Sequence, residues 1–128
     1  MKRGALVIAV TVATVLALPA TALGVAAFRT PKKAAYCGLT EGEGPPHLLC
    51  WTPNDGFTVD MGGRNHVRKR YISANRGYFD PASARILRFG QSWRSGPFRC
   101  ASARSGLTCT NGGRHGWWLG RFRGYRIF

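Results

Sequence analysis

Two short β-prone runs with a turn between them occupy residues 98–110, whose sequence is Phe98-Arg99-Cys100-Ala101-Ser102-Ala103-Arg104-Ser105-Gly106-Leu107-Thr108-Cys109-Thr110. If residues 98–101 and 107–110 pair as a hairpin that turns about Arg104-Ser105, then Cys100 lies directly opposite Cys109. Opposed residues at a non-hydrogen-bonded position of an antiparallel pair are close enough for a disulfide bond. The stretch therefore predicts a hairpin closed by a Cys100–Cys109 bridge.

A weak internal repeat extends this interpretation to the first half of the chain. Each half has an aromatic lead-in, a cysteine-bearing hairpin and a further aromatic residue. The members are Phe28-Arg29-Thr30, Cys37, Cys50 and Phe57 in the first half, and Trp93-Arg94-Ser95, Cys100, Cys109 and Trp117 in the second. Counting about Glu43-Gly44 sets Cys37 opposite Cys50, so we predict Cys37–Cys50 and Cys100–Cys109 rather than the two crossed pairings. The halves lie at about 28–63 and 90–128 of a single β-rich domain over residues 28–128.

The rest of the chain favours the same class of structure. Short β-rich runs alternate with Gly, Pro, Asn and Asp, and no long stretch has apolar residues at helical spacing. Asn111-Gly112-Gly113 is a hairpin-type turn, and one short helical turn is expected at Pro81–Arg85 after Asp80. We predict an all-β or β-dominated fold, a small disulfide-stapled domain of short antiparallel hairpins. The expected strands are Ala34–Cys37, His47–Trp51, Phe57–Met61, Val67–Ile72, Arg85–Phe89, Phe98–Ala101, Leu107–Thr110, Gly116–Leu119 and Gly124–Phe128.

The N-terminal segment, residues 1–27, has the pattern of a secretory signal peptide. Two basic residues precede a charge-free run at 4–28, and small residues permit cleavage after Ala27, which the sequence favours, or after Ala22. The alternative is an uncleaved anchor, because the run is long enough to cross about 30 Å of hydrocarbon. We expect a protein that is secreted or associated with the cell envelope, and attached to a membrane only where the segment stays uncleaved.

All four cysteines lie beyond this segment. An even number of cysteines in a small exported chain is typical of disulfides. Their spacings lack the close pairs of a zinc site. We therefore expect disulfides, no metal and no cofactor.

The chain is strongly basic, with 19 Lys and Arg against 5 Asp and Glu in 128 residues and a formal net charge of +14. Removal of the signal segment takes away Lys2 and Arg3, and the remaining 17 basic and 5 acidic residues give a formal net charge of +12. Nine arginines and no acidic residue follow Asp80. A guanidinium group binds phosphate or carboxylate with two hydrogen bonds and stacks on aromatic rings. The excess therefore favours an anionic partner, although a high net charge can also serve solubility alone.

Two sets of residues are candidates for contact with such a partner. Alternation along a strand would place Arg68 and Arg70 on one face and Lys69 on the other. Adjacent Trp117 and Trp118 cannot both face the core, so we expect one inside and one exposed or covered by a loop; both are candidates for stacking on a ligand. The candidate anion-binding residues are Arg68, Lys69, Arg70, Arg114, Arg121, Arg123 and Arg126.

Several motifs also resemble those of a family of small exported bacterial proteins, mostly actinobacterial, that is catalogued only as a domain of unknown function. The motifs are Phe28-Arg29-Thr30-Pro31, Tyr36-Cys37, Arg88-Phe89-Gly90-Gln91-Ser92-Trp93, Phe98-Arg99-Cys100, Ser105-Gly106-Leu107-Thr108-Cys109-Thr110-Asn111, His115-Gly116-Trp117 and Tyr125-Arg126-Ile127-Phe128. The resemblance spans nearly all of the chain after the signal segment. It implies secretion and disulfides but no reaction, ligand or site. Many relatives carry a further cysteine pair between the halves, which this chain lacks.

No catalytic signature is present, and no residue is assigned a catalytic role. We expect non-catalytic binding to anionic envelope polymers such as teichoic acid or acidic glycan, with nucleic acid as another candidate partner. The first alternative is a small extracellular nuclease or hydrolase, in which His66 and His115, with Glu41 and Glu43, would supply general acid and base. The second is a protein-binding or inhibitor module.

Overall fold

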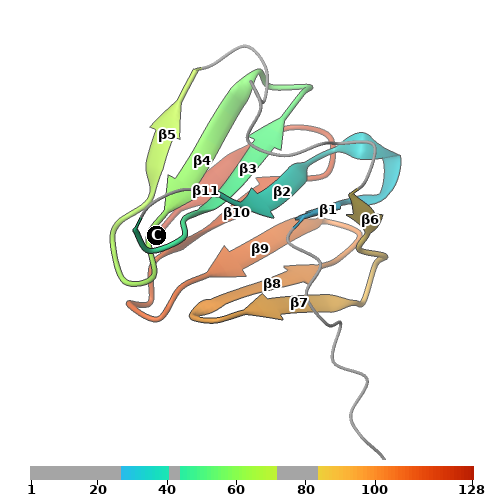
Figure 1. The fold of residues 1–128 in the computed structure, drawn as a ribbon. Helices are drawn as coiled ribbons and strands as arrows, with labels where there is room; N and C mark the ends of the chain where they lie inside the picture. Colours follow the sequence, from blue (N-terminus) through green and yellow to red (C-terminus); the bar gives the residue numbers. More distant parts are fainter. Residues whose placement is uncertain (1–26, 41–43, 72–83) are drawn as a thin grey trace, which may run out of the picture.

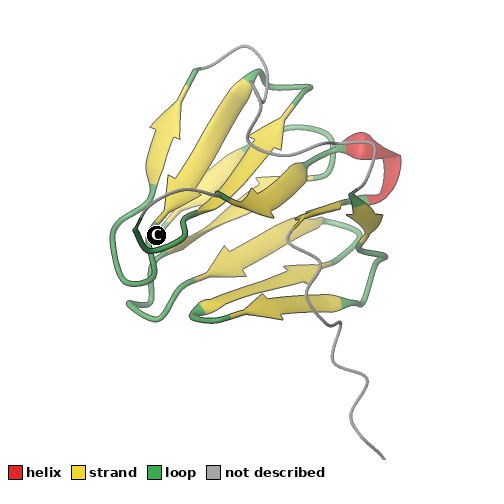
Figure 2. Cartoon of the chain, in the orientation of Figure 1, coloured by secondary structure: helices red, strands yellow, loops and turns green. Residues whose placement is uncertain are grey.

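The computed structural model describes residues 27–40, 44–71 and 84–128, which form two β-sheets (Figure 1). The first sheet has the strand order β5-β4-β3-β2-β1-β6 and the second β11-β10-β9-β8-β7. Figure 2 shows the short 3-10 turn η1 (Pro31–Lys33) in red. The predicted β-dominated fold of short antiparallel hairpins is confirmed. The strands are β1 (Ala27–Arg29), β2 (Tyr36–Leu39), β3 (Leu48–Thr52), β4 (Phe57–Met61), β5 (Arg68–Arg70), β6 (Arg85–Ile86), β7 (Ser92–Ser95), β8 (Phe98–Ser102), β9 (Gly106–Thr110), β10 (Gly116–Gly120) and β11 (Tyr125–Ile127).

Both predicted disulfides are present, each across a hairpin. Cys37 and Cys50 are opposed on β2 and β3, and Cys100 and Cys109 on β8 and β9. The two Cα atoms of each pair are 4.1 Å apart, close to the spacing of a non-hydrogen-bonded antiparallel pair. The β8–β9 hairpin turns at the predicted residues 104–105, flanked by reciprocal backbone hydrogen bonds between Ala103 and Gly106.

The internal repeat corresponds to the register of the two sheets. The aromatic lead-ins are strands β1 and β7, which were not among the expected strands. The predicted equivalence of Phe57 with Trp117 is wrong by two residues, because Val59 is the residue paired with Cys50. The predicted equivalence matched two aromatic residues by type, whereas the equivalent positions of the two halves are set by which residues pair across the strands. The equivalent cross-strand rows are Phe28, Cys37, Cys50 and Val59 in the first sheet, and Trp93, Cys100, Cys109 and Trp117 in the second.

The two sheets pack on each other around a shared core. The rings of Phe28 on β1 and Trp93 on β7 lie 5.1 Å apart, and both disulfides belong to the same buried cluster. Trp117 is completely buried in this core. Because successive side chains of a strand point to opposite faces, Trp118 lies on the outer surface of the second sheet, where it is half-exposed. The prediction of one inward and one outward tryptophan is confirmed.

Several expected boundaries differ from the observed ones. The strand expected at Arg85–Phe89 ends at Ile86, because residues 88–91 form a turn in which the Gln91 N–H donates to the carbonyl of Arg88 and Gly90 has a φ of 84°. Of the helical turn expected at Pro81–Arg85, residues 81–83 lie outside the described residues, and Arg85 begins β6. Residues 1–26 of the predicted signal segment also lie outside them. In the described part of the chain, no helix is long and apolar enough to cross a membrane.

Candidate functional site

The seven candidate anion-binding residues lie on different parts of the molecule. Arg68 and Arg70 project from the outer face of the first sheet, opposite Asp60 and Thr58. The Nη2 atom of Arg68 donates to a carboxylate oxygen of Asp60 at 3.0 Å. Arg68 is therefore partly neutralised, whereas Arg70 is exposed with no carboxylate within ion-pair distance among the described residues.

Lys69 points to the opposite face of β5, as predicted, and lies among three aromatic rings. Its Nζ atom is 4.8 Å from the ring centre of Phe57, 4.0 Å from that of Tyr71 and 4.4 Å from that of Tyr125. A hydrogen bond to the hydroxyl of Tyr71 raises the pKa of Lys69 above its usual range. The charge of Lys69 thus serves a cation–π contact between β5 and β11.

The remaining candidates differ in exposure. Arg121 is half-buried, and its guanidinium carbon lies 5.0 Å from the ring centre of Phe89 and 4.9 Å from that of Phe122. Arg114 and Arg123 are exposed in the turns at the two ends of β10. The buried position of Trp117 removes it from the residues that could stack on a ligand.

Arg126 belongs to a larger basic surface on the outside of the second sheet. The side chains of Arg94 and Arg99 on this surface point outward, because their strand neighbours Trp93, Phe98 and Cys100 face the core. Successive side chains of a strand point to opposite faces. Arg94 on β7 is directly opposite Arg99 on β8, and all three arginines are exposed. We call this surface the arginine face; it comprises Arg94, Arg99, Thr108, Thr110, Trp118 and Arg126. Arg94 and Arg99 are missing from the predicted set, although the alternation of buried residues in 92–102 would have identified them.

Trp118 is the aromatic residue of the arginine face, on β10 next to the edge strand β11. A Cβ atom on Gly106 would lie 2.9 Å from its indole nitrogen, and one on Gly120 would lie 3.1 Å from its ring. The absence of side chains at these two glycines therefore lets the indole lie against the sheet. On β11, the guanidinium carbon of Arg126 is 5.3 Å from the centre of the Trp118 ring. The arrangement combines an aromatic platform with a cation, as in sites that hold sugars or bases of charged polymers.

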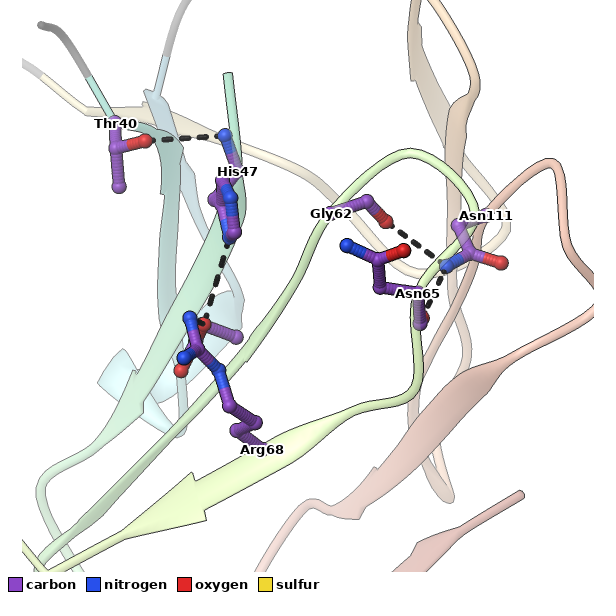
Figure 3. A network of polar contacts seen from close by, with 7 residues as sticks. Thr40, His47, Gly62, Asn65, Arg68 and Asn111 are labelled. Atoms are coloured by element: carbon purple, nitrogen blue, oxygen red, sulfur yellow. Dashed lines mark hydrogen bonds and ion pairs between the residues drawn. The ribbon is translucent and has the colours of Figure 1, made fainter. Parts of the chain in front are cut away.

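A second group of polar residues lies where two loops meet between the sheets. Buried Asn111 donates from Nδ2 to the carbonyl oxygens of Gly62 and Asn65, at 2.9 and 2.8 Å (Figure 3). Its Oδ1 accepts the backbone N–H groups of Gly113 and His115 at 2.9 and 3.0 Å. One amide side chain thus satisfies four backbone groups and joins the loop at 62–66 to the turn at 111–115.

This junction brings the two histidines of the nuclease hypothesis together. The ring centres of His66 and His115 are 3.9 Å apart. They line a hollow of about 530 Å³ that we call the histidine recess, whose other lining residues are His47, Gly62, Arg64, Asn65 and Arg68. Figure 3 shows His47 and Arg68 together on the left and Asn111 with Gly62 and Asn65 on the right. Glu41 and Glu43, the other members of that hypothesis, lie outside the described residues. Within the described ranges, no group of three or more His, Cys, Asp or Glu residues converges to hold a metal ion.

Replacing Asn111 by alanine is expected to destabilise the protein by about 2–3 kcal/mol, because several partly buried backbone groups lose their hydrogen bonds. Urea unfolding measured by tryptophan emission gives this difference. Asn65→Ala is the matched control, since the carbonyl of Asn65, and not its side chain, accepts the bond. An Asn111→Ala loss no larger than that of the control would contradict the role of Asn111 as the link between the loops.

Comparison with protein-family models, curated proteins and solved structures finds no match for this chain. The geometry of the arginine face and of the histidine recess therefore carries the functional argument.

Proposed function

We propose that the protein binds anionic polymers non-catalytically through the arginine face. The observation that carries the proposal is the register of the second sheet, which places Arg94, Arg99 and Arg126 on the same outward surface as Trp118. No acidic residue follows Asp80, so no strand of this sheet carries an acidic side chain that could neutralise them.

The opposed arginines support an external anion in particular. Like charges directly opposite each other on neighbouring strands are destabilising, and Arg94 faces Arg99 in this way. A bound phosphate or carboxylate between them would convert this repulsion into two charge-assisted contacts. The unfavourable pair is thus accounted for by a ligand that neutralises it.

The size of the face favours a polymer over a small anion. Five strands at a spacing of about 4.8 Å place Arg94 on β7 and Arg126 on β11 roughly 19 Å apart across the sheet. A chain with repeated negative groups could contact both ends while a sugar ring stacks on Trp118. Teichoic acid and acidic glycans combine these features, and single-stranded nucleic acid presents bases in place of sugars.

A binding function fits the histidines better than the alternative hydrolase. General acid–base cleavage of a phosphodiester requires the acid and the base each to reach the reacting group. His66 and His115 instead contact each other, with ring centres 3.9 Å apart. This separation leaves no room for a phosphate between the two rings, so they do not flank a scissile bond as an acid and a base acting from opposite sides.

The proposed place of action is outside the cell. The two disulfides are compatible with an extracellular location, and the signal pattern of residues 1–27 supports export. Ala27 already pairs with Gly38 in the first sheet. We therefore favour cleavage after Ala22, which would leave β1 complete, over cleavage after Ala27.

Binding of purified teichoic acid is expected to weaken steeply with salt. If three arginines each neutralise one phosphate, the affinity should fall about 30-fold between about 50 mM and about 200 mM salt, because bound counterions are released on association. Calorimetry gives the affinity. Quenching of the emission of half-exposed Trp118 shows whether the polymer binds over that side chain. In Trp118→Phe the quenching should shrink while calorimetric binding remains. Affinity that does not change with salt would refute the proposal; acidic glycan and single-stranded DNA measured in parallel rank the polymers.

A further inference from the structure

The histidine recess is a second cationic site, separate from the arginine face. It is built from four segments: His47 precedes β3, Arg64 and His66 lie in the loop after β4, Arg68 begins β5, and His115 precedes β10. Asn111 fixes the loop at 62–66 against the turn at 111–115. The backbone of these loops is in such close contact that a Cβ atom on Gly113 would lie 2.3 Å from the carbonyl oxygen of Arg64.

The charges around the recess are unbalanced. Among the described residues, Asp60 contacts two residues that line the recess: its carboxylate lies 3.0 Å from the guanidinium of Arg68 and 3.6 Å from Nδ1 of His47. No carboxylate lies within ion-pair distance of Arg64 in the described part of the chain, and Arg64 is exposed. The recess thus has a free guanidinium beside two imidazoles in contact, with Arg114 in the same turn as His115.

We propose that the histidine recess binds a phosphate group, held by Arg64, His66 and His115 with support from Arg68. A phosphate has oxygens in several directions, and here guanidinium and imidazole donors approach from the loop at 62–66, from β5 and from the turn at 111–115. A carboxylate presents only two oxygens in one plane and would use fewer of these donors. The hollow of about 530 Å³ leaves room for the group to which the phosphate is attached.

Protonation of the histidines should strengthen this binding. Imidazole is the side chain that ordinarily changes its charge between pH 5 and 8. Two imidazolium rings with centres 3.9 Å apart repel each other, and the guanidinium groups of Arg64 and Arg68 repel them as well. His47, which lies beside Asp60, is the third histidine at the recess. A bound anion offsets this repulsion, so phosphate binding and proton uptake favour each other.

The test uses dimethyl phosphate, a diester whose single charge is constant over this pH range, so that any change in affinity comes from the protein. The ring proton resonances of His66 and His115 are followed by NMR during titration at about pH 5.5 and about pH 8. We expect saturable shifts of both rings and an affinity about tenfold higher at the lower pH. Inorganic phosphate in a parallel titration distinguishes a free or terminal phosphate from a diester within a chain.

Three variants decide whether the recess is responsible. Arg64→Gln, at an exposed position, should weaken binding at both pH values, and His115→Gln should reduce the pH dependence, as followed by the remaining ring of His66. Arg94→Gln on the arginine face should leave the histidine titration unchanged, which separates this site from the proposed polymer-binding face. The proposal is overturned if the histidine shifts do not saturate, or if Arg64→Gln and Arg94→Gln weaken them equally.

Discussion

Replacing Cys37 and Cys50 by alanine, or Cys100 and Cys109, is expected to lower the free energy of unfolding by about 3 kcal/mol for each pair. Each bridge closes a short loop, of 13 or 9 residues in sequence separation, and so restricts the unfolded chain. Loss of both bridges removes about 6 kcal/mol, which is comparable with the whole stability of a small domain. The variant with all four alanines should therefore be unfolded, as measured by urea titration and far-UV circular dichroism.

The wild-type protein, reduced and kept reduced during the titration, is the matched control. It loses the covalent restraint but keeps the four sulfur atoms, which are completely buried in the core. The alanine variants lose both, so the difference between the two measurements is the packing contribution of the sulfur atoms. A loss below about 1 kcal/mol for either alanine pair would contradict the view that the bridges carry much of the stability.

The cysteine pairing could be predicted from the sequence because it depends on local counting. Within a hairpin, the position of the turn determines which residues are opposed, and the turn at Arg104-Ser105 was identifiable from neighbouring residues. Because successive side chains of a strand point to opposite faces, the sequence also assigned Trp117 and Trp118 correctly to opposite faces. It likewise placed Lys69 on the face opposite to Arg68 and Arg70. Strands β1 and β7 were missed as strands, although their residues Phe28 and Trp93 had been identified as the aromatic lead-ins of the repeat.

The histidine recess could not be predicted in this way. It depends on Asn111 bonding to Gly62 and Asn65, which lie 49 and 46 residues away in the sequence. That contact follows from how the two sheets pack, and no spacing within either loop encodes it. His66 and His115 were recognised as a candidate pair from their chemistry alone, and the two sheets supply the proximity.

The arginine face makes the most direct prediction about function. Changing Arg94, Arg99 and Arg126 together to glutamine is expected to weaken binding of an anionic polymer about 100-fold at low salt. It should also reduce the slope of log affinity against log salt by about 2 to 3, since each arginine accounts for roughly one neutralised phosphate. The fold should be retained, because these side chains are exposed and removal of the opposed Arg94–Arg99 pair relieves a repulsion. Calorimetry over a series of salt concentrations measures both quantities.

A matched variant distinguishes a specific face from a general effect of net charge. Arg70, Arg85 and Arg88 are exposed arginines outside the second sheet, and changing them to glutamine removes the same total charge. If attraction depended only on the charge of the whole molecule, both triple variants would lose affinity and salt dependence equally, and the proposed face would be wrong. If register determines binding, the control keeps its salt slope, because polymer phosphates are neutralised only by cations that a single chain can contact at once. The spacing of Arg94, Arg99 and Arg126 along one continuous sheet meets that condition, whereas a large positive charge spread over both sheets does not.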